Sequence, residues 1–220
     1  MRLIFATNNK HKFSEIVEIL GEKYKDFVFL MSDLGVFVDP EEKGETFKEN
    51  AHIKSMSLYD EMKKRNLLMN GDFIISDDTG LCIDYLNGEP GIYSARFLGP
   101  NVSQDEKNEK ILELMKDVQN DDRKAYFITI LSVIEVDDAS QSKITEHFFE
   151  GRVDGYIAKK IEKIGGFGYD PIFAVGSPDD IEKGFVKTYS NIGATEKNKI
   201  SHRARALSNF VHYLEKTHNI

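Results

Sequence analysis

The stretch Phe73-Ile74-Ile75-Ser76-Asp77-Asp78-Thr79-Gly80 lies at the centre of the pattern that predicts the fold. Phe73 to Ser76 is typical of a buried strand, and two carboxylates follow it at once. Polar groups in this position are expected at a carboxyl end of the sheet, where α/β proteins bind ligands. A divalent cation relieves the repulsion between neighbouring carboxylates, and oxygen ligands suit Mg²⁺. An Asp-rich turn without a ligand is the alternative interpretation.

Strands and helices are predicted on both sides of this stretch. Capping-box patterns at Thr46 with Glu49 and at Ser103 with Glu106 predict two helix starts. Periodicity adds short strands over residues 3–7 and 171–175, helices over 10–20 and about 195–215, and a β-hairpin from 125–136 and 143–151. Strands that alternate with helices, plus one hairpin, predict an α/β fold with a mixed sheet flanked by helices.

Length and composition limit the possible classes of protein. The 220 residues suffice for one large α/β domain or for two lobes that share a core. The net charge of −8 disfavours general binding to nucleic acid. Cys82 is the single cysteine, so no intramolecular disulfide can form, which fits a reducing, cytoplasmic compartment. No signal peptide is visible and no segment is apolar enough to span a membrane, so no membrane partner is expected.

The segment from Thr7 to Lys12, Thr-Asn-Asn-Lys-His-Lys, is a candidate phosphate site. A predicted strand ends here and a helix begins, and free backbone N–H groups at a helix start favour an anion. Lysines in a first turn oppose the helix dipole unless something negative binds there. Asn8 and Asn9 tolerate the left-handed conformations that such a turn can need. The alternative is an ordinary Asn-rich cap with solvated lysines.

Two further segments carry candidate ligand-binding groups. In residues 165–171, three glycines beside two aromatic residues allow backbone to approach a flat ligand while a ring stacks on it; a tight loop packed by its own aromatics is the alternative. Residues 196–203 place basic groups at the start of the last predicted helix, where a solvated charged face is the usual explanation. The acidic pair Glu41-Glu42 is interpreted as a solvated loop unless it folds back towards Asp78. Zinc, P-loop and nucleophile-elbow patterns are absent from the sequence.

The order of these blocks along the chain resembles the inosine/xanthosine triphosphate pyrophosphatase family. Six blocks carry the resemblance: residues 7–12, 46–51, 76–81, 90–96, 165–171 and 201–203. The block Tyr93-Ser94-Ala95-Arg96 is closer to the bacterial-type branch. Members are homodimers with an elongated mixed sheet and two lobes, with the active site in the cleft between them. The resemblance therefore implies one nucleoside triphosphate pyrophosphatase domain over residues 1–220, with Mg²⁺ as cofactor.

The resemblance also implies roles for particular residues. Asp78 corresponds to the proton acceptor that activates water and, with Glu41, to the metal-binding carboxylates. Lys54 corresponds to a lysine directed at the phosphates. The remaining substrate contacts implied are Thr7, Asn8, Asn9, Lys10, His11, Lys12, Thr79, Phe167, Gly168, Tyr169, Asp170, Lys197, His202 and Arg203.

The expected reaction is attack of water on the α-phosphorus of ITP, dITP or XTP, which releases pyrophosphate and a monophosphate. Arg203 can donate hydrogen bonds to a purine keto oxygen and accepts none from an amino group, so discrimination against ATP is expected. Lys12 is expected to be exposed and to matter for binding more than for stability. A non-catalytic nucleotide-binding module and an interaction protein are the alternatives, and pyrophosphate release from ITP with and without Mg²⁺ separates all three.

Overall fold

The computed structural model describes residues 1–162, 166–176, 180, 183 and 187–218. The chain divides into two compact units. The first unit comprises Met1–Asp78, Thr129–Gly151 and Arg203–Ile220, and the second comprises Thr79–Ile128 and Arg152–His202. Gly165 of the predicted glycine-rich loop lies outside the described residues.

A seven-stranded sheet has the order β2-β1-β3-β4-β5-β6-β7. Its strands are β1 (Arg2–Phe5), β2 (Val28–Leu30), β3 (Asp72–Ile83), β4 (Lys124–Asp138), β5 (Lys143–Ile157), β6 (Phe173–Val175) and β7 (Lys187–Thr188). β1 runs parallel to β2 and to β3, whereas β6 is antiparallel to β5 and to β7. The sheet is therefore mixed, as predicted, and the hairpin partners β4 and β5 are neighbours.

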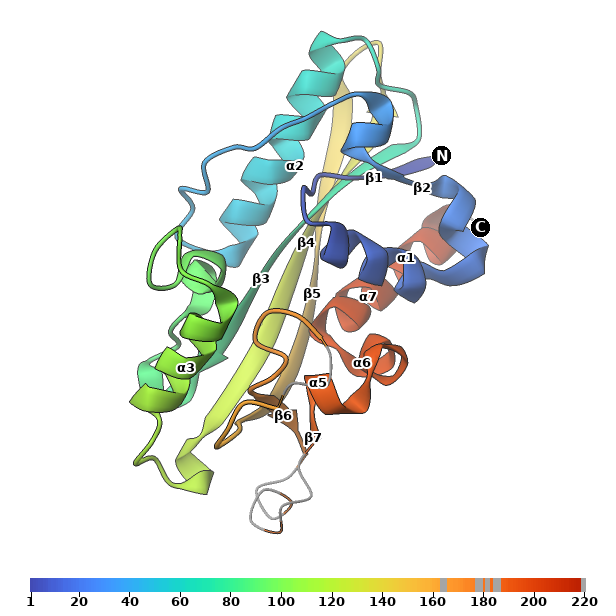
Figure 1. Ribbon diagram of the computed structural model, residues 1–220. Helices are drawn as coiled ribbons and strands as arrows, with labels where there is room; N and C mark the ends of the chain where they lie inside the picture. The colour runs from blue at the N-terminus through green and yellow to red at the C-terminus, as the bar shows by residue number, and fades with distance from the viewer. Residues whose placement is uncertain (163–165, 177–179, 181–182, 184–186, 219–220) are drawn as a thin grey trace. The chain divides into compact units, whose positions relative to one another are not determined.

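Six α-helices are labelled among the described residues (Figure 1). They are α1 (Lys10–Tyr24), α2 (Phe47–Lys64), α3 (Gln104–Leu114), α5 (Tyr189–Ile192), α6 (Ala194–Ile200) and α7 (His202–His218). Short 3₁₀ helices cover Lys25–Phe27, Met31–Leu34, Asp84–Leu86, Gly91–Arg96 and Asn120–Asp122. No described helix is both long enough and apolar enough to cross a membrane.

The first unit buries apolar side chains on both faces of its strands, because successive side chains of a strand point to opposite faces. Leu3 and Phe5 of β1 join a cluster with residues of α1 and α7. Ile4, from the same strand, joins a second cluster with Leu58 and Met62 of α2. In Figure 1, α2 accordingly lies on one side of the strands, and α1 and α7 lie on the other. This helix–sheet–helix arrangement holds β3 in the middle layer.

The second unit has a core of its own. Ile111 of α3 and Met115, the residue that follows this helix, pack with Leu81 of β3 and Phe127 of β4. Tyr169 and Tyr189 belong to the same cluster. A Cβ atom on Gly155 of β5 would lie 2.3 Å from the carbonyl oxygen of Ala174, so glycine is required where β5 passes β6.

Two sequence expectations need correction, and one strand was missed. β3 continues to Ile83, so the strand does not end at Ser76 and the two aspartates do not lie at its carboxyl end; the alternative of an Asp-rich turn is wrong as well. The single predicted helix over 195–215 is two helices, because Ser201 adopts an extended conformation (φ −67°, ψ 160°) between α6 and α7. Strand β2 was not predicted; it has only three residues, all half-buried, and therefore carries no clear alternation.

Candidate active site

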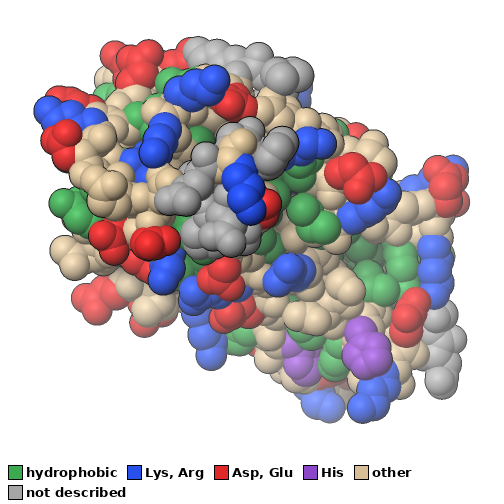
Figure 2. Space-filling model, turned by 90° about the horizontal axis from the view of Figure 1, so that it is seen from below, with side chains coloured by type: hydrophobic (Ala, Val, Ile, Leu, Met, Phe, Trp, Pro, Cys, Tyr) green, Lys and Arg blue, Asp and Glu red, His purple; other side chains and the backbone are tan. Residues whose placement is uncertain are grey.

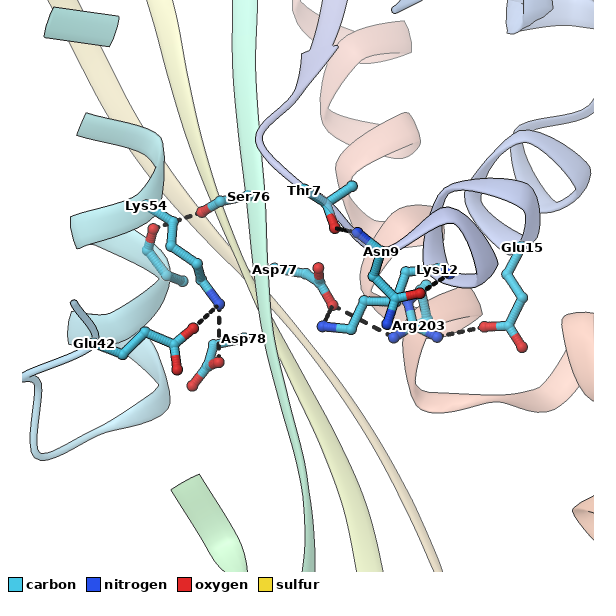
Figure 3. A network of polar contacts seen from close by, with 11 residues as sticks. Thr7, Asn9, Lys12, Glu15, Glu42, Lys54, Ser76, Asp77, Asp78 and Arg203 are labelled. Atoms are coloured by element: carbon cyan, nitrogen blue, oxygen red, sulfur yellow. Dashed lines mark hydrogen bonds and ion pairs between the residues drawn. The ribbon is translucent and has the colours of Figure 1, made fainter. Parts of the chain in front are cut away.

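Asp77 and Asp78 lie on opposite faces of β3 (Figure 3). The strand runs through both residues, and the period of two directs neighbouring side chains to opposite faces. Asp77 points towards α1 and α7, and Asp78 points towards α2. The prediction that mutual repulsion of this pair creates a cation site is therefore wrong. Each carboxylate has a separate set of partners.

Asp77 is a buried acceptor for two cations of the first unit. Lys12 Nζ lies 2.9 Å from Asp77 Oδ2, and Arg203 Nη2 lies 3.4 Å from the same oxygen. Burial by itself raises the pKa of a carboxyl, but the charges of Lys12, Arg203 and Lys54 outweigh it and hold the pKa of Asp77 far below its ordinary value. Asp77 is therefore a permanent anion that neutralises Lys12 and Arg203.

Asp78 has the opposite electrostatic character. Its carboxyl group is buried, which raises its pKa, and the charge of nearby Glu42 raises it further. The charge and the hydrogen bond of Lys54 lower it, but the pKa of Asp78 stays above the ordinary value. Lys54 Nζ lies 3.0 Å from Asp78 Oδ1, whereas Asp78 Oδ2 is buried and has no hydrogen-bond partner among the described residues. A carboxylate with a raised pKa and an unengaged oxygen has the properties of a general base.

Lys54 of α2 joins two carboxylates. Its Nζ lies 2.9 Å from Glu42 Oε1 as well as 3.0 Å from Asp78 Oδ1. Burial lowers the pKa of this lysine, but Asp78, Asp77 and Glu42 together more than offset that effect, so the pKa is raised and the ammonium group stays charged. Thr46 caps α2 by accepting the backbone N–H of Glu49. The other half of the expected capping box is absent, because Glu49 accepts the N–H of Glu45 instead of that of Thr46.

The acidic loop before α2 folds back through Glu42. Glu41, which the resemblance identifies with a metal ligand, forms an exposed ion pair with Lys43. Its metal-binding role stays a prediction, and Glu42 is the loop carboxylate that the structure brings to Lys54. Sequence analysis considered this folding back only as an exception, and it had no means of choosing between adjacent glutamates.

The turn from Thr7 to Lys12 forms the start of α1. Asn9 is the N-cap residue, and its side-chain oxygen accepts the backbone N–H of Lys12 at 3.1 Å; the hydroxyl of Thr7 accepts the N–H of Asn9 at 3.1 Å. The exposed Asn8 donates to the carbonyl of Val38. Neither asparagine has a positive φ, so the turn does not use the left-handed conformation that these residues would tolerate.

The lysines of this turn differ from one another. Lys10 and His11 are exposed, as a phosphate-facing turn permits. The expectation of an exposed Lys12 is wrong, because its ammonium group lies against Asp77 and burial lowers its pKa despite that carboxylate. The loss of this half-buried, paired lysine should therefore lower stability as well as ligand binding.

Arg203 is almost completely buried, at 1% exposure. Its Nη1 donates to Glu15 of α1 and its Nη2 to Asp77, whereas Nε has no hydrogen-bond partner in the described part of the chain. The structure thus joins Arg203 to α1 and β3 through two carboxylates. Its role in recognising a purine stays a prediction. Glu15 was not found from the sequence, since one glutamate on a helix carries no distinguishing signal.

The second unit holds the glycine-aromatic loop in a defined shape. Asp170 Oδ2 accepts the backbone N–H of Phe167 at 2.9 Å and lies 2.7 Å from Lys197 Nζ, and both charged side chains are 4% exposed. Lys197 Nζ also lies 4.5 Å from the centre of the Phe167 ring. The loop and Lys197 were both predicted as substrate contacts, and here they form one buried polar cluster.

Other predicted contacts of this unit are engaged within the protein. The hydroxyl of Tyr169 donates to the carbonyl of Ser94 at 2.8 Å, and burial raises the pKa of this phenol. His202 stacks on Phe127 with ring centres 4.5 Å apart, and it is 3% exposed. Thr79 is half-buried on β3. The substrate roles of these three residues stay predictions.

The described residues contain no group of three or more His, Cys, Asp or Glu side chains arranged to hold a metal ion. The oxygen donors of Asp78 and Glu42 are nonetheless of the type that Mg²⁺ prefers, and Asp78 Oδ2 is available. Mg²⁺ commonly binds through one or two carboxylates, with phosphate oxygens and waters as its other ligands. The donor set fits an ion that arrives with a phosphorylated substrate.

The fold and these carboxylate and lysine clusters define an α/β protein of one known family: residues 3–213 match the model of the Ham1 family, and the chain belongs to it. Over 216 residues it is 42% identical to the dITP/XTP pyrophosphatase of Caldanaerobacter subterraneus subsp. tengcongensis, covering 98% of this chain and 97% of that protein. It is 41% identical to the dITP/XTP pyrophosphatase of Clostridium perfringens, with 94% and 93% covered. The Staphylococcus aureus Ham1 protein has a similar structure (TM-score 0.77, 34% identity, 98% and 99% covered).

Proposed function

We propose that this protein is a nucleoside triphosphate pyrophosphohydrolase that converts ITP, dITP and XTP to their monophosphates and removes them from the nucleotide pool. The observation that carries the proposal is the contrast on β3: Asp77 is a paired anion, whereas Asp78 has a raised pKa and an available oxygen. Membership of the Ham1 family and relatives named dITP/XTP pyrophosphatase support it.

In the proposed reaction, Asp78 accepts a proton from water as the water attacks the α-phosphorus. The bond between the α-phosphorus and the bridging oxygen breaks, and pyrophosphate leaves with that oxygen. Lys54 and the turn from Thr7 to Lys12 bind the phosphates, since lysines and helix-start N–H groups both stabilise negative charge. Lys54 has the further effect of orienting Asp78 through its bond to Oδ1.

Asp78 would hold Mg²⁺ together with a carboxylate of the acidic loop, either Glu41, as the family pattern implies, or Glu42, as its position suggests. When bound, the ion neutralises charge on the phosphate oxygens. In the second unit, Phe167 to Asp170 and Lys197 would contact the base, with His202. Arg203 of the first unit would contribute to the preference for a keto purine.

The whole chain would act as one enzyme domain and assemble as a homodimer in the cytoplasm. The net charge of −8 disfavours a nucleic acid as the partner. On the face drawn in Figure 2, the acidic and basic side chains of described residues are interspersed, which does not resemble a broad basic surface.

The experiment that tests the proposal is pyrophosphate release from ITP, XTP and ATP, with Mg²⁺ and with the metal chelated. We expect rapid release from the keto purines with Mg²⁺ and slow release from ATP. Tight ITP binding without turnover would instead identify a nucleotide-binding module, and the absence of both would overturn the proposal.

A further inference from the structure

The loop proposed to contact the base is shaped by bonds from outside it. Gly166 has φ +82°, and a Cβ atom there would lie 2.6 Å from Asp170 Oδ2. That carboxylate closes the loop by accepting the N–H of Phe167. Two groups of the loop are instead bonded to other parts of the second unit: the carbonyl of Gly168 and the side-chain hydroxyl of Tyr169.

Helix α3 holds the first of them. Asn108 is 1% exposed, and its side-chain amide donates to the carbonyl of Gly168 at 3.2 Å. Gly168 has φ +63°, so its peptide takes an orientation that most residues avoid. A bond to that carbonyl therefore fixes the direction of the peptide that joins Gly168 to Tyr169.

The second connection runs through the segment Gly91–Arg96. The Tyr169 hydroxyl donates to the carbonyl of Ser94, and Lys107 Nζ donates to the carbonyl of Ala95 at 2.6 Å. Ser94 is itself fixed, because its hydroxyl donates to Gly91 and accepts the N–H of Leu81. Lys107, adjacent to Asn108 on α3, thus supports the segment to which Tyr169 is bound.

Burying the ammonium group of Lys107 is energetically unfavourable. It is 6% exposed, and its hydrogen bond among the described residues goes to a carbonyl rather than to a carboxylate. Burial accordingly lowers its pKa. A buried cation whose acceptor is neutral carries a large desolvation free energy, and an apolar side chain would be enough to fill the space. The arrangement is explained if the position of the Ser94–Ala95 backbone matters.

We propose that Lys107 and Asn108 are positioning residues for purine recognition: from α3 they set the shape of the Phe167–Asp170 loop and so the discrimination between bases. This inference rests on the proposed function and deepens it. The two residues touch neither the phosphates nor Asp78 in this scheme. Their loss should therefore weaken binding of the base and leave the chemical step unchanged.

The test compares Asn108→Asp with wild type. The variant has the same shape, but its carboxylate cannot donate to Gly168 and repels that carbonyl. We expect KM for ITP to rise roughly tenfold, about the effect of one hydrogen bond, with kcat unchanged and the ratio of kcat/KM for ITP over ATP reduced. Inhibition by inorganic tripolyphosphate, which has no base, should keep its wild-type constant. Glu109→Ala, on the exposed side of α3, is the matched control and should behave as wild type.

A second variant keeps the test independent of folding. Tyr169→Phe retains the buried ring and removes the hydroxyl, which donates to Ser94 and also interacts with Gln104 of α3. It should shift KM and the base ratio in the same direction. Unchanged base discrimination in both variants would overturn the inference, and so would an equal loss of tripolyphosphate affinity. If wild type released no pyrophosphate from ITP, the proposed function would fail; binding of IMP against AMP would then still report on Asn108.

Discussion

At the scale of the residue, β3 gives adjacent aspartates opposite properties. Burial acts on both carboxyl groups, but at Asp77 the charges of Lys12, Arg203 and Lys54 outweigh it and lower the pKa, whereas at Asp78 burial dominates and raises the pKa. No difference in residue type distinguishes the two, so the difference arises from the face of the strand on which each lies. A buried anion that is fully paired suits a structural role, and a buried carboxyl with an available oxygen suits proton transfer.

Asp78→Asn should fold normally and lose most of its turnover. The substitution is nearly isosteric but removes the basic oxygen, and general-base catalysis alone is worth ~10²–10⁴-fold. In wild type, activity should fall as pH decreases through the pKa of Asp78, because only the ionised form accepts a proton. Since that pKa is raised, the midpoint of the acid limb should lie above the ordinary aspartate value of about 4. A variant that keeps more than a tenth of wild-type turnover would exclude Asp78 as the base.

Asp77→Asn should instead lower stability. Removing one partner of a buried ion pair costs roughly 3–5 kcal/mol, because Lys12 and Arg203 lose their shared acceptor. The folded pKa of Asp77 lies below the unfolded value, so its contribution is complete above the unfolded pKa and is lost as pH falls towards the folded one. Urea unfolding at several pH values should show a constant difference from wild type above about pH 5 that shrinks below about pH 4. A difference that grew on acidification would contradict this.

At the scale of the element, the sequence predicted helices and strands better than their ends. Thr46 and Ser103 cap α2 and α3 as expected, because a cap depends on local side-chain chemistry. The break between α6 and α7 at Ser201 was missed, since a single serine within a run of helix-forming residues does not by itself indicate a helix end. The continuation of β3 past Asp77 was missed because the bonds that stabilise these carboxylates come from Lys12 and Lys54, distant in sequence.

Contacts between residues distant in sequence also limited how much of the candidate site could be predicted. Motif order identified Asp78 of β3 together with Lys54 and Lys12, and the two lysines do form ion pairs with Asp78 and Asp77 of that strand. It could not assign Glu42 rather than Glu41 to Lys54, nor pair Arg203 with Glu15, because those choices depend on how the loop before α2 and the start of α7 pack.

The start of α1 allows a matched pair of substitutions. Lys12→Ala should raise KM for ITP and also lower stability by about 2 kcal/mol, because Asp77 loses its nearer cation while Arg203 remains and the lysine is partly screened by solvent. Lys10→Ala, in the same turn but exposed, should leave the melting temperature within about 1 °C of wild type. Equal melting temperatures for Lys12→Ala and wild type would show that the ion pair with Asp77 contributes nothing.

At the scale of the whole molecule, the two compact units hold different parts of the proposed chemistry. The first contains Asp78, Lys54 and the turn before α1, and the second contains the Phe167–Asp170 loop and Lys197. Each unit has its own apolar core, so each set of side chains is supported locally. In the proposed function the first set binds the triphosphate and the second binds the base, so ligand binding should be visible in the stability of the folded chain.

Ligand-dependent stability tests that expectation without turnover. In the inactive Asp78→Asn variant, a ligand at a hundred times its Kd stabilises the folded state by about 2.7 kcal/mol. For a chain of this length, such a gain corresponds to a rise in melting temperature of roughly 5–10 °C. ITP should produce this rise, and ATP at the same concentration should produce much less, because its amino group leaves buried donors unpaired. Inorganic tripolyphosphate is the control for the phosphates alone and should give a smaller rise than ITP. If ATP and ITP stabilised the variant equally, the base would not be recognised, and the preference for keto purines would have to be abandoned.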